Sequence, residues 1–339
     1  MPHRVLPIAL ALTSILGASS GAQTDADREL RESLSRRMDE EVARFAGGFR
    51  RELGRDVPAG GLAAVLERLP YEELVHTVVG TRPPRLVGLA DLALEIGDRR
   101  VVAVGEQHDD AAHHEIQART LALLHRLDAR VAVGMEMFQR PAQVHLDDFL
   151  AFRTSQAEFL ERVDWAKSWG FDYGLYEEIL SFARDHALPV VALNAPRDAI
   201  RSVSRAGLAS LAPDVRATLA AEIDTSIASH RRRFEANMAG HPPHGNPDFI
   251  YEAMCAWDDT MAESAALFLT SNPGWRILVL AGNGHVESGD GIPDRIEKRL
   301  RVGHAIVVPR AVAPDEAIDF AALLADPPGD YVVFTRSGG

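Results

Sequence analysis

The sequence has few of the features that would place it in several broad classes of protein. Its 339 residues include one cysteine, Cys255, which excludes an internal disulfide and a metal centre built from several cysteines. It has no run of about 20 apolar residues, so we expect no transmembrane segment. The net charge is −13 and the only basic tract is at 231–233, so nucleic acid is a poor candidate partner. The protein must be stabilised by ordinary core packing.

The first 22 residues have the pattern of a signal peptide. Arg4 supplies a positive charge, residues 6–16 are apolar, and small residues stand at Ser20 and Ala22. This pattern predicts cleavage after Ala22 and export to the periplasm or the extracellular space. No cysteine lies at the cleavage point, so we expect no lipid anchor there.

Residues 23–69 are predicted to form an N-terminal helical extension. Within it, Leu34, Met38 and Val42 recur every four residues among charged side chains, which is typical of an exposed helix with one apolar stripe. A second short helix is predicted over 62–75, and residues 81–90 are interpreted as a connector because they contain two adjacent prolines.

From residue 101 onward, short β-branched runs alternate with helical patterns. This rhythm predicts an α/β fold: a mostly parallel β-sheet flanked by helices on both faces. The rhythm is interrupted at about 197–270, which predicts an inserted all-helical subdomain. The main domain is assigned to 70–310, and the C-terminal segment, 311–339, contains a possible last strand at 331–335. The predicted strands of the main domain are 101–104, 130–137, 189–194, 276–282 and 303–309.

Polar residues follow the apolar runs of four of the predicted strands, at the end where open α/β sheets bind their ligands. They are Glu106 and His108, then Glu136, then Asn194 with Arg197, and finally His285. Both histidines belong to a Gly-x-x-His pattern. We expect each glycine to allow a sharp turn with positive φ, so that the imidazole can point back over the edge of the sheet.

This set of side chains suits two kinds of chemistry. His108, His285 and Glu136 could bind a divalent metal such as zinc, manganese or iron. Alternatively, Glu106 or Glu136 could act as a general base on a water molecule. Polar residues are also common at strand ends for structural reasons, and Asn194 could simply cap a helix.

Three further features remain open at this stage. His113 and His114 lie near the start of a predicted helix, where capping or solvation is as plausible as a site. His241 and His244 flank a Pro-Pro turn, which could bind a metal or a haem iron or could be merely polar. Trp257 belongs to an apolar stripe at 253–269 that favours core packing over contact with a cofactor.

Five motifs in order resemble those of the bacterial ChaN-like haem-binding uptake family. This family belongs to a superfamily with the Tiki proteins and the erythromycin esterases. The resemblance covers about residues 70–310 and implies a parallel-sheet α/β core with an inserted helical part. The motifs are VVAVGEQHDDAAHH, GMEMF, ALNAPRDAI, AWDDTMAES and LAGNGHVE.

The resemblance implies haem as a cofactor and a role in haem or iron uptake at the cell envelope. A haem site needs an apolar slot, an axial ligand and cationic groups for the propionates. The partner that completes such a slot could be a second copy of the chain or an envelope transport component. Candidate haem-binding residues are Tyr173, Tyr176, His241, His244, Asn194, Arg197 and Trp257.

The wider superfamily implies an alternative, a metal-dependent hydrolase of an ester or peptide bond. Its enzymatic members resemble hydrolases that use paired Gly-x-x-His motifs and glutamates. In this sequence the corresponding residues are Glu106, His108, Glu136 and His285. The same four residues follow from the strand-end argument.

Overall fold

The computed structural model describes residues 59–75, 77–239 and 245–338. These residues belong to one compact unit, Gly54–Gly339. The predicted signal peptide, the predicted helix within 27–57, and His241 and His244 lie outside the described residues.

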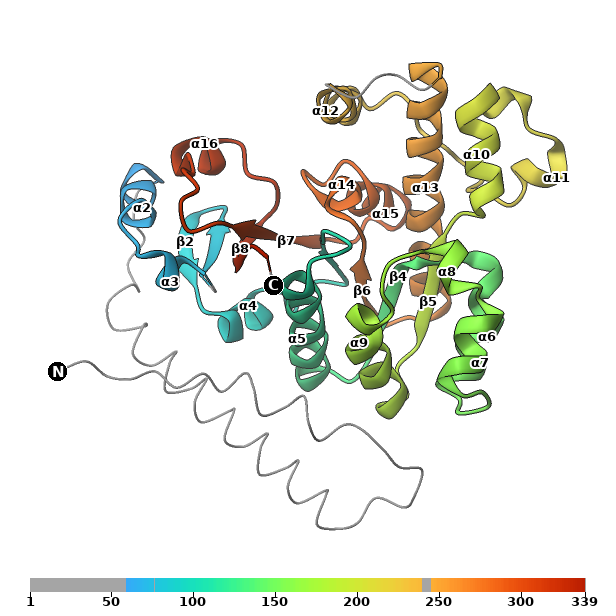
Figure 1. The fold of residues 1–339 in the computed structure, drawn as a ribbon, viewed down its shortest axis with the longest axis horizontal. Coiled ribbons are helices and arrows are strands. Elements are labelled where there is room, and N and C mark those ends of the chain that lie inside the picture. Colours follow the sequence, from blue (N-terminus) through green and yellow to red (C-terminus); the bar gives the residue numbers. More distant parts are fainter. Residues whose placement is uncertain (1–58, 76, 240–244, 339) are drawn as a thin grey trace, which may run out of the picture. The chain divides into compact units, whose positions relative to one another are not determined.

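The described part of the chain contains an eight-stranded mixed sheet (Figure 1) with the order β2-β1-β8-β7-β3-β6-β4-β5. The strands from β8 to β5 in this order are parallel to their neighbours, whereas β1 runs antiparallel to β2 and to β8. The strand bounds are β1 Val78–Thr81, β2 Pro84–Val87, β3 Val101–Val104, β4 Val131–Gln139, β5 Val190–Asn194, β6 Arg276–Leu280, β7 His304–Val312 and β8 Tyr331–Arg336.

The central strands are apolar along their whole length because both faces of the sheet are covered. Alternate side chains of β3 point to opposite faces. Val102 and Val104 belong to a core with the helices on one side, while Val101 and Ala103 belong to the core on the other side.

Helices cover each part of the sheet. The first face packs against α4 Leu89–Ile96, α5 Ala111–Leu127, α6 Gln143–Leu150, α7 Gln156–Arg162, α8 Trp165–Ser168 and α9 Gly174–Asp185. The second face packs against α13 Pro247–Ser271, α14 Asn283–Val286 and α15 Ile292–Leu300. A smaller core beside β1 and β8 includes side chains of α2 Ala59–Leu66, α3 Tyr71–Leu74 and α16 Phe320–Ala325. No described helix is both long and apolar enough to cross a lipid bilayer.

The chain between β5 and β6 is helical wherever it is regular in the described residues. It contains α10 Arg197–Ala206, α11 Pro213–Arg216, α12 Ala228–Met238 and α13, with a short 3-10 turn at Leu208–Ser210. Helices α10 and α13 lie side by side (Figure 1) and share a small apolar core. The predicted fold class, a mostly parallel sheet flanked by helices with a helical insertion, is therefore confirmed.

Two local features differ from the sequence-based expectation. Residues 81–90 are more than a connector, because Pro84–Val87 forms β2 and pairs with β1 in a hairpin. A proline is acceptable there because β2 is an edge strand. Strand β4 also continues beyond the predicted end at 137 to Gln139, with a register shift between Met135 and Gln139, so Glu136 lies within the strand.

Candidate functional site

The candidate site lies at the carboxyl ends of four adjacent parallel strands, β3, β6, β4 and β5. Glu106 and His108 follow β3, Glu136 lies near the end of β4, Asn194 ends β5, and His285 lies in α14 just after β6. The sheet order therefore brings to one edge the residues that the strand-end argument selected. We call this the strand-edge site.

The two motif glycines, Gly105 and Gly282, do not have a positive φ. They are needed because neighbouring atoms leave no room for a side chain. A Cβ atom on Gly105 would lie 2.0 Å from the Asn283 side-chain oxygen. A Cβ on Gly282 would lie 2.8 Å from Cε1 of His108. The expectation of a positive φ at these glycines was therefore wrong, and their role is to let the two motifs approach each other.

Glu106 is a buried carboxylate that holds His108 in place. Its Oε1 lies 2.7 Å from His108 Nδ1 and also accepts a 3.0 Å hydrogen bond from the Tyr176 hydroxyl. Its Oε2 accepts a 2.8 Å hydrogen bond from the Gln117 amide. Burial disfavours a charged His108, but the bond to Glu106 and the charges of Glu136 and Glu106 outweigh it, so the pKa of His108 is raised.

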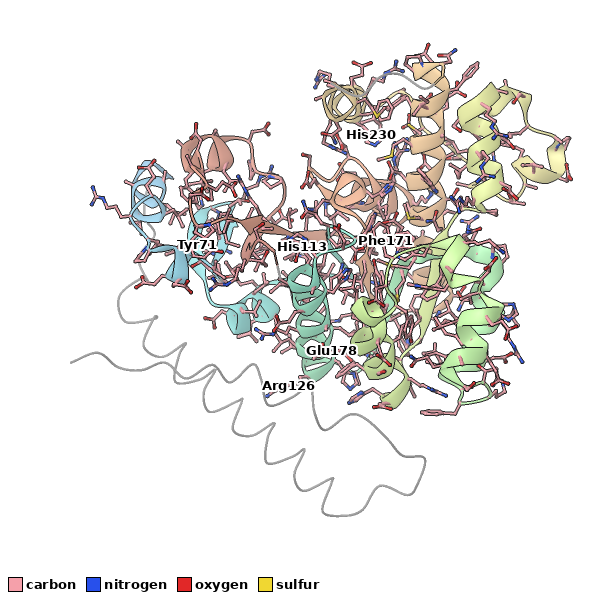
Figure 2. All side chains as sticks on the ribbon, in the orientation of Figure 1. Tyr71, His113, Arg126, Phe171, Glu178 and His230 are labelled. Carbon is pink, nitrogen blue, oxygen red and sulfur yellow. The ribbon has the colours of Figure 1, made fainter. Side chains whose placement is uncertain are left out.

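The outer nitrogen of His108, Nε2, has no hydrogen-bond partner among the described residues, and 30% of the side chain is exposed. The rings of Trp169 and Phe171 lie 4.7 and 5.0 Å from the imidazole. Phe171 is itself exposed and is labelled in Figure 2. His108 therefore offers one nitrogen to solvent beside two aromatic rings.

Glu136 and His285 form a second, more buried unit. Glu136 Oε2 accepts a 2.7 Å hydrogen bond from the Gly282 amide, and Oε1 lies 3.4 Å from His285 Nε2. The other imidazole nitrogen, Nδ1, lies 2.6 Å from Asp258 Oδ1. Burial opposes charge on His285, but Glu136 and Asp258 overcome it and raise its pKa to about 9. His285 is thus an imidazolium between two carboxylates at neutral pH.

The residues after β5 support this edge in different ways. The Asn194 amide donates a 2.9 Å hydrogen bond to the Glu136 carbonyl oxygen, and Pro196 is the residue that caps α10. The alternative that Asn194 caps a helix is therefore wrong. Arg197 is exposed, and its guanidinium donates to the Lys167 carbonyl oxygen. Trp257 is partly buried, with its ring 6.0 Å from His285.

Tyr173 and Tyr176 lie in the core and not at the surface of the site. They are 8% and 0% exposed, and burial raises the pKa of both phenols. The Tyr176 hydroxyl accepts from Trp169 and donates to Glu106. Contrary to the prediction that they bind the cofactor, neither phenol oxygen is available to a haem iron in this structure.

His113 and His114 are also buried, so neither is a solvated side chain, and Asp110 caps the helix α5. His114 contacts the His108 carbonyl oxygen at 3.2 Å and the Gln117 side chain at 3.2 Å. His113, labelled in Figure 2, accepts a hydrogen bond from the backbone N–H of Gln107. It lines a cavity of about 430 Å³ together with Gln107 and Asn283.

Comparison with known proteins identifies the family. The family of haem-binding uptake proteins in the Tiki superfamily, ChaN, matches residues 92–296. The chain belongs to the ChaN family. No curated protein sequence matches it significantly.

A solved structure of the same family agrees with this fold. ChaN of Campylobacter jejuni, described with cofacial haem binding, is 20% identical with a TM-score of 0.58, covering 76% of this chain and 95% of that chain. An erythromycin esterase, EreC, is 14% identical with a TM-score of 0.41, covering 65% of this chain and 72% of that one.

The described residues do not form a metal centre at the strand-edge site. His108, His285 and Glu136 do not place three ligand atoms within 4.8 Å of one another. Among the described residues, only Asp294, Glu297 and His304 do so, and two of these are exposed. The geometry and the ChaN family match give no support to the predicted divalent metal.

Several contacts of the site were not selected from the sequence. Gln117 lies three residues after His114 on a helix, and this spacing weakly indicates a shared face. Trp169 and Phe171 form a short aromatic run, which weakly indicates an apolar surface. Asp258 was noted only as a neighbour of an apolar stripe. His230 lies 2.9 Å from Asp258. No motif in the sequence marks it, because it lies on a helix and not at a strand end.

Proposed function

We propose that this ChaN-family chain is an exported haem-binding protein of the bacterial cell envelope that takes part in haem or iron uptake, with His108 as the axial ligand. Family membership supports haem as the cofactor. The observation that carries the ligand assignment is the free, half-buried Nε2 of His108 beside Trp169 and Phe171.

The residues around His108 fit a haem. Neutral imidazole nitrogen is a common axial ligand, and bound haem supplies an iron centre that such a ligand tunes. The 2.7 Å contact between His108 Nδ1 and Glu106 fixes the ring and makes Nε2 more basic. The rings of Trp169 and Phe171 supply apolar surface for a flat macrocycle.

Cationic groups for the propionates lie near this aromatic surface. The Arg197 guanidinium contacts the carbonyl oxygen of Lys167, whose own side chain is 82% exposed. Lys167 lies in α8, two residues before Trp169. Guanidinium and ammonium groups bind carboxylates through charge-assisted hydrogen bonds, so Arg197 and Lys167 are the proposed propionate contacts.

The test is a visible-absorbance titration of the protein from residue 23 onward with ferric haem. We expect a sharpened Soret band that saturates at a fixed haem-to-protein ratio. His108→Ala should remove the spectrum of the histidine-ligated haem. His186→Ala is the matched control, because His186 is an exposed histidine in the turn after α9, away from the strand edge.

Two results would contradict this proposal. A broad, unsaturable spectrum would show only nonspecific haem adsorption. A saturable spectrum that is unchanged in His108→Ala would keep haem binding and reject the ligand assignment.

Export and a partner are also part of the proposal. The pattern of residues 1–22 supports export, and the mass of the secreted chain should correspond to a start at Gln23. The similar ChaN of Campylobacter jejuni is described with cofacial haem binding, so a second copy of the chain is the first partner to test. Sedimentation with and without haem would show a haem-dependent dimer, and an unchanged monomer would leave an envelope transport component as the partner.

A second candidate function is hydrolysis of an ester or peptide bond. It is favoured by the His108–Glu106 contact, because an imidazole oriented by a buried carboxylate is the arrangement of a general base. Metal analysis of the purified protein and an ester hydrolysis assay test it. Hydrolysis by the unmodified chain that disappears in both His108→Ala and His285→Ala would support this function, and no hydrolysis would exclude it.

A further inference from the structure

The helical insertion reaches the strand-edge site through a buried carboxylate, Asp258. This residue lies on α13 and is fully buried. Its Oδ1 lies 2.6 Å from His285 Nδ1, and its Oδ2 lies 2.9 Å from Nε2 of His230 on α12. These last two atoms are close to each other but are not aligned as a hydrogen bond. His230 is labelled in Figure 2 beside α12.

The short contact with Asp258 fixes how His285 is protonated. An ionised carboxylate can only accept a hydrogen bond, so Nδ1 of His285 must carry a proton. The ring is then oriented with Nε2 facing Glu136 Oε1 at 3.4 Å. Both imidazole nitrogens of His285 are therefore occupied by carboxylates, unlike those of His108.

Glu136 in turn is held beside His108. Its Oε2 accepts from the Gly282 amide, and the space at Gly282 is filled by the His108 ring. Asp258 therefore contacts His285, and His285 contacts Glu136. Glu136 in turn binds the backbone of Gly282, against which the His108 ring packs.

We infer that Asp258 is a positioning residue of the strand-edge site, which keeps Nδ1 of His285 protonated, fixes the orientation of the ring and thereby holds Glu136 beside His108. The helical insertion is then part of the site, because it supplies both Asp258 and His230. The effect on haem rests on the proposed function, whereas the effect on His285 does not.

The chain offers a matched control next to this residue. Asp259 is also a buried carboxylate of α13, but it pairs with Arg295 and Arg299 and accepts from the Asp224 amide. Asp258→Asn and Asp259→Asn therefore remove the same charge from neighbouring positions of one helix. Only Asp258→Asn removes the negative charge that faces His285, because the asparagine oxygen can accept only a weaker, uncharged hydrogen bond.

The first experiment is proton and nitrogen NMR of the haem-free protein. We expect a strongly deshielded exchangeable proton on Nδ1 of His285, assigned by its loss in His285→Gln. Asp258→Asn should move this resonance strongly upfield, because an amide oxygen is a weaker acceptor than a carboxylate, and Asp259→Asn should leave it unchanged. The inference is overturned if the unmodified protein shows Nδ1 of His285 unprotonated.

The second experiment is the ferric haem titration of the same two variants. Loss of an outer-shell partner typically weakens binding at a site 10- to 100-fold, so we expect Asp258→Asn to weaken haem binding by about tenfold. Asp259→Asn should bind within about threefold of the unmodified chain. Equal affinities in all three proteins would overturn the role in haem binding. If the unmodified chain binds no haem, the proposed function fails, and the NMR result still decides the role of Asp258.

Discussion

At the residue scale, the two Gly-x-x-His imidazoles differ in what their nitrogens face. His108 gives Nδ1 to Glu106 and leaves Nε2 free of described partners, while His285 faces a carboxylate at both nitrogens. A histidine that ligates a haem iron needs a free ring nitrogen. This difference is why we propose His108 as the ligand and give His285 a supporting role.

The buried contacts of His285 with Glu136 and Asp258 predict that stability depends on pH. The pKa of His285 is raised from 6.5 to about 9, so the folded state binds the proton more tightly than the unfolded state. This stabilisation is fully present below pH 6.5 and is lost as the pH rises to about 9. Its upper size is on the order of 3 kcal/mol.

Urea denaturation of the unmodified chain and of His285→Gln at pH 6.5 and pH 9 measures this effect. The free energy of unfolding should fall between these two pH values in the unmodified chain by more than it falls in His285→Gln. An equal fall in both proteins would show that His285 is not the group responsible.

The single cysteine predicts low thiol reactivity. Cys255 is fully buried, and burial raises the pKa of its thiol from 9.0 to about 11. A two-unit shift lowers the thiolate fraction roughly a hundredfold. We expect Ellman's reagent to react with the native protein at least that much more slowly than with the unfolded protein, and comparable rates would contradict the buried position.

The sequence identifies the site residues near strand ends better than those on the helices of the insertion. Glu106, His108, Glu136 and His285 follow strands or lie near strand ends, so the position of the sheet edge is enough to select them. Asp258 and His230 come from helices of the insertion. Their approach depends on how α12 and α13 pack, which no local pattern encodes.

At the element scale, helix α5 connects the site to the core. Its N-terminus is capped by the Asp110 side chain, and Gln117 on its buried face donates to Glu106. Leu121, one turn later, is fully buried. The same buried face therefore anchors the helix and supports the carboxylate that holds His108.

This packing predicts the effect of truncating one helix at two positions. Leu121→Ala should lower the free energy of unfolding by about 2–5 kcal/mol because it leaves a cavity in the core. Leu127→Ala, at a position of the same helix that is 44% exposed, should change it by less than about 1 kcal/mol. Similar losses in thermal or urea denaturation of the two variants would contradict the described orientation of α5.

Among the elements, strands were easier to predict than connections. The run 101–104 reads as a strand because it is short, apolar and β-branched, and the structure forms β3 there. The β1–β2 hairpin was missed because Pro83 and Pro84 suggested a break. Only the tertiary context, which makes β2 an edge, permits a proline at its start.

At the scale of the whole molecule, the sheet order explains why one edge carries the site. Strands β3, β6 and β4 are neighbours in the sheet although β6 follows β4 by more than a hundred residues. The helical insertion between β5 and β6 accounts for this separation. Its last helix, α13, contacts the site through Asp258. The haem site that we propose at His108 therefore depends on the correct crossover of the chain and not on a single motif.

The most direct test of this account is chemical rescue at His108. His108→Gly should bind ferric haem without the spectrum of a histidine ligand, and added imidazole should restore the spectrum of the unmodified protein by occupying the vacated position. The same imidazole should have no effect on His186→Gly. If His108→Gly keeps the unmodified spectrum, or if imidazole changes both variants alike, His108 is not the ligand of the haem.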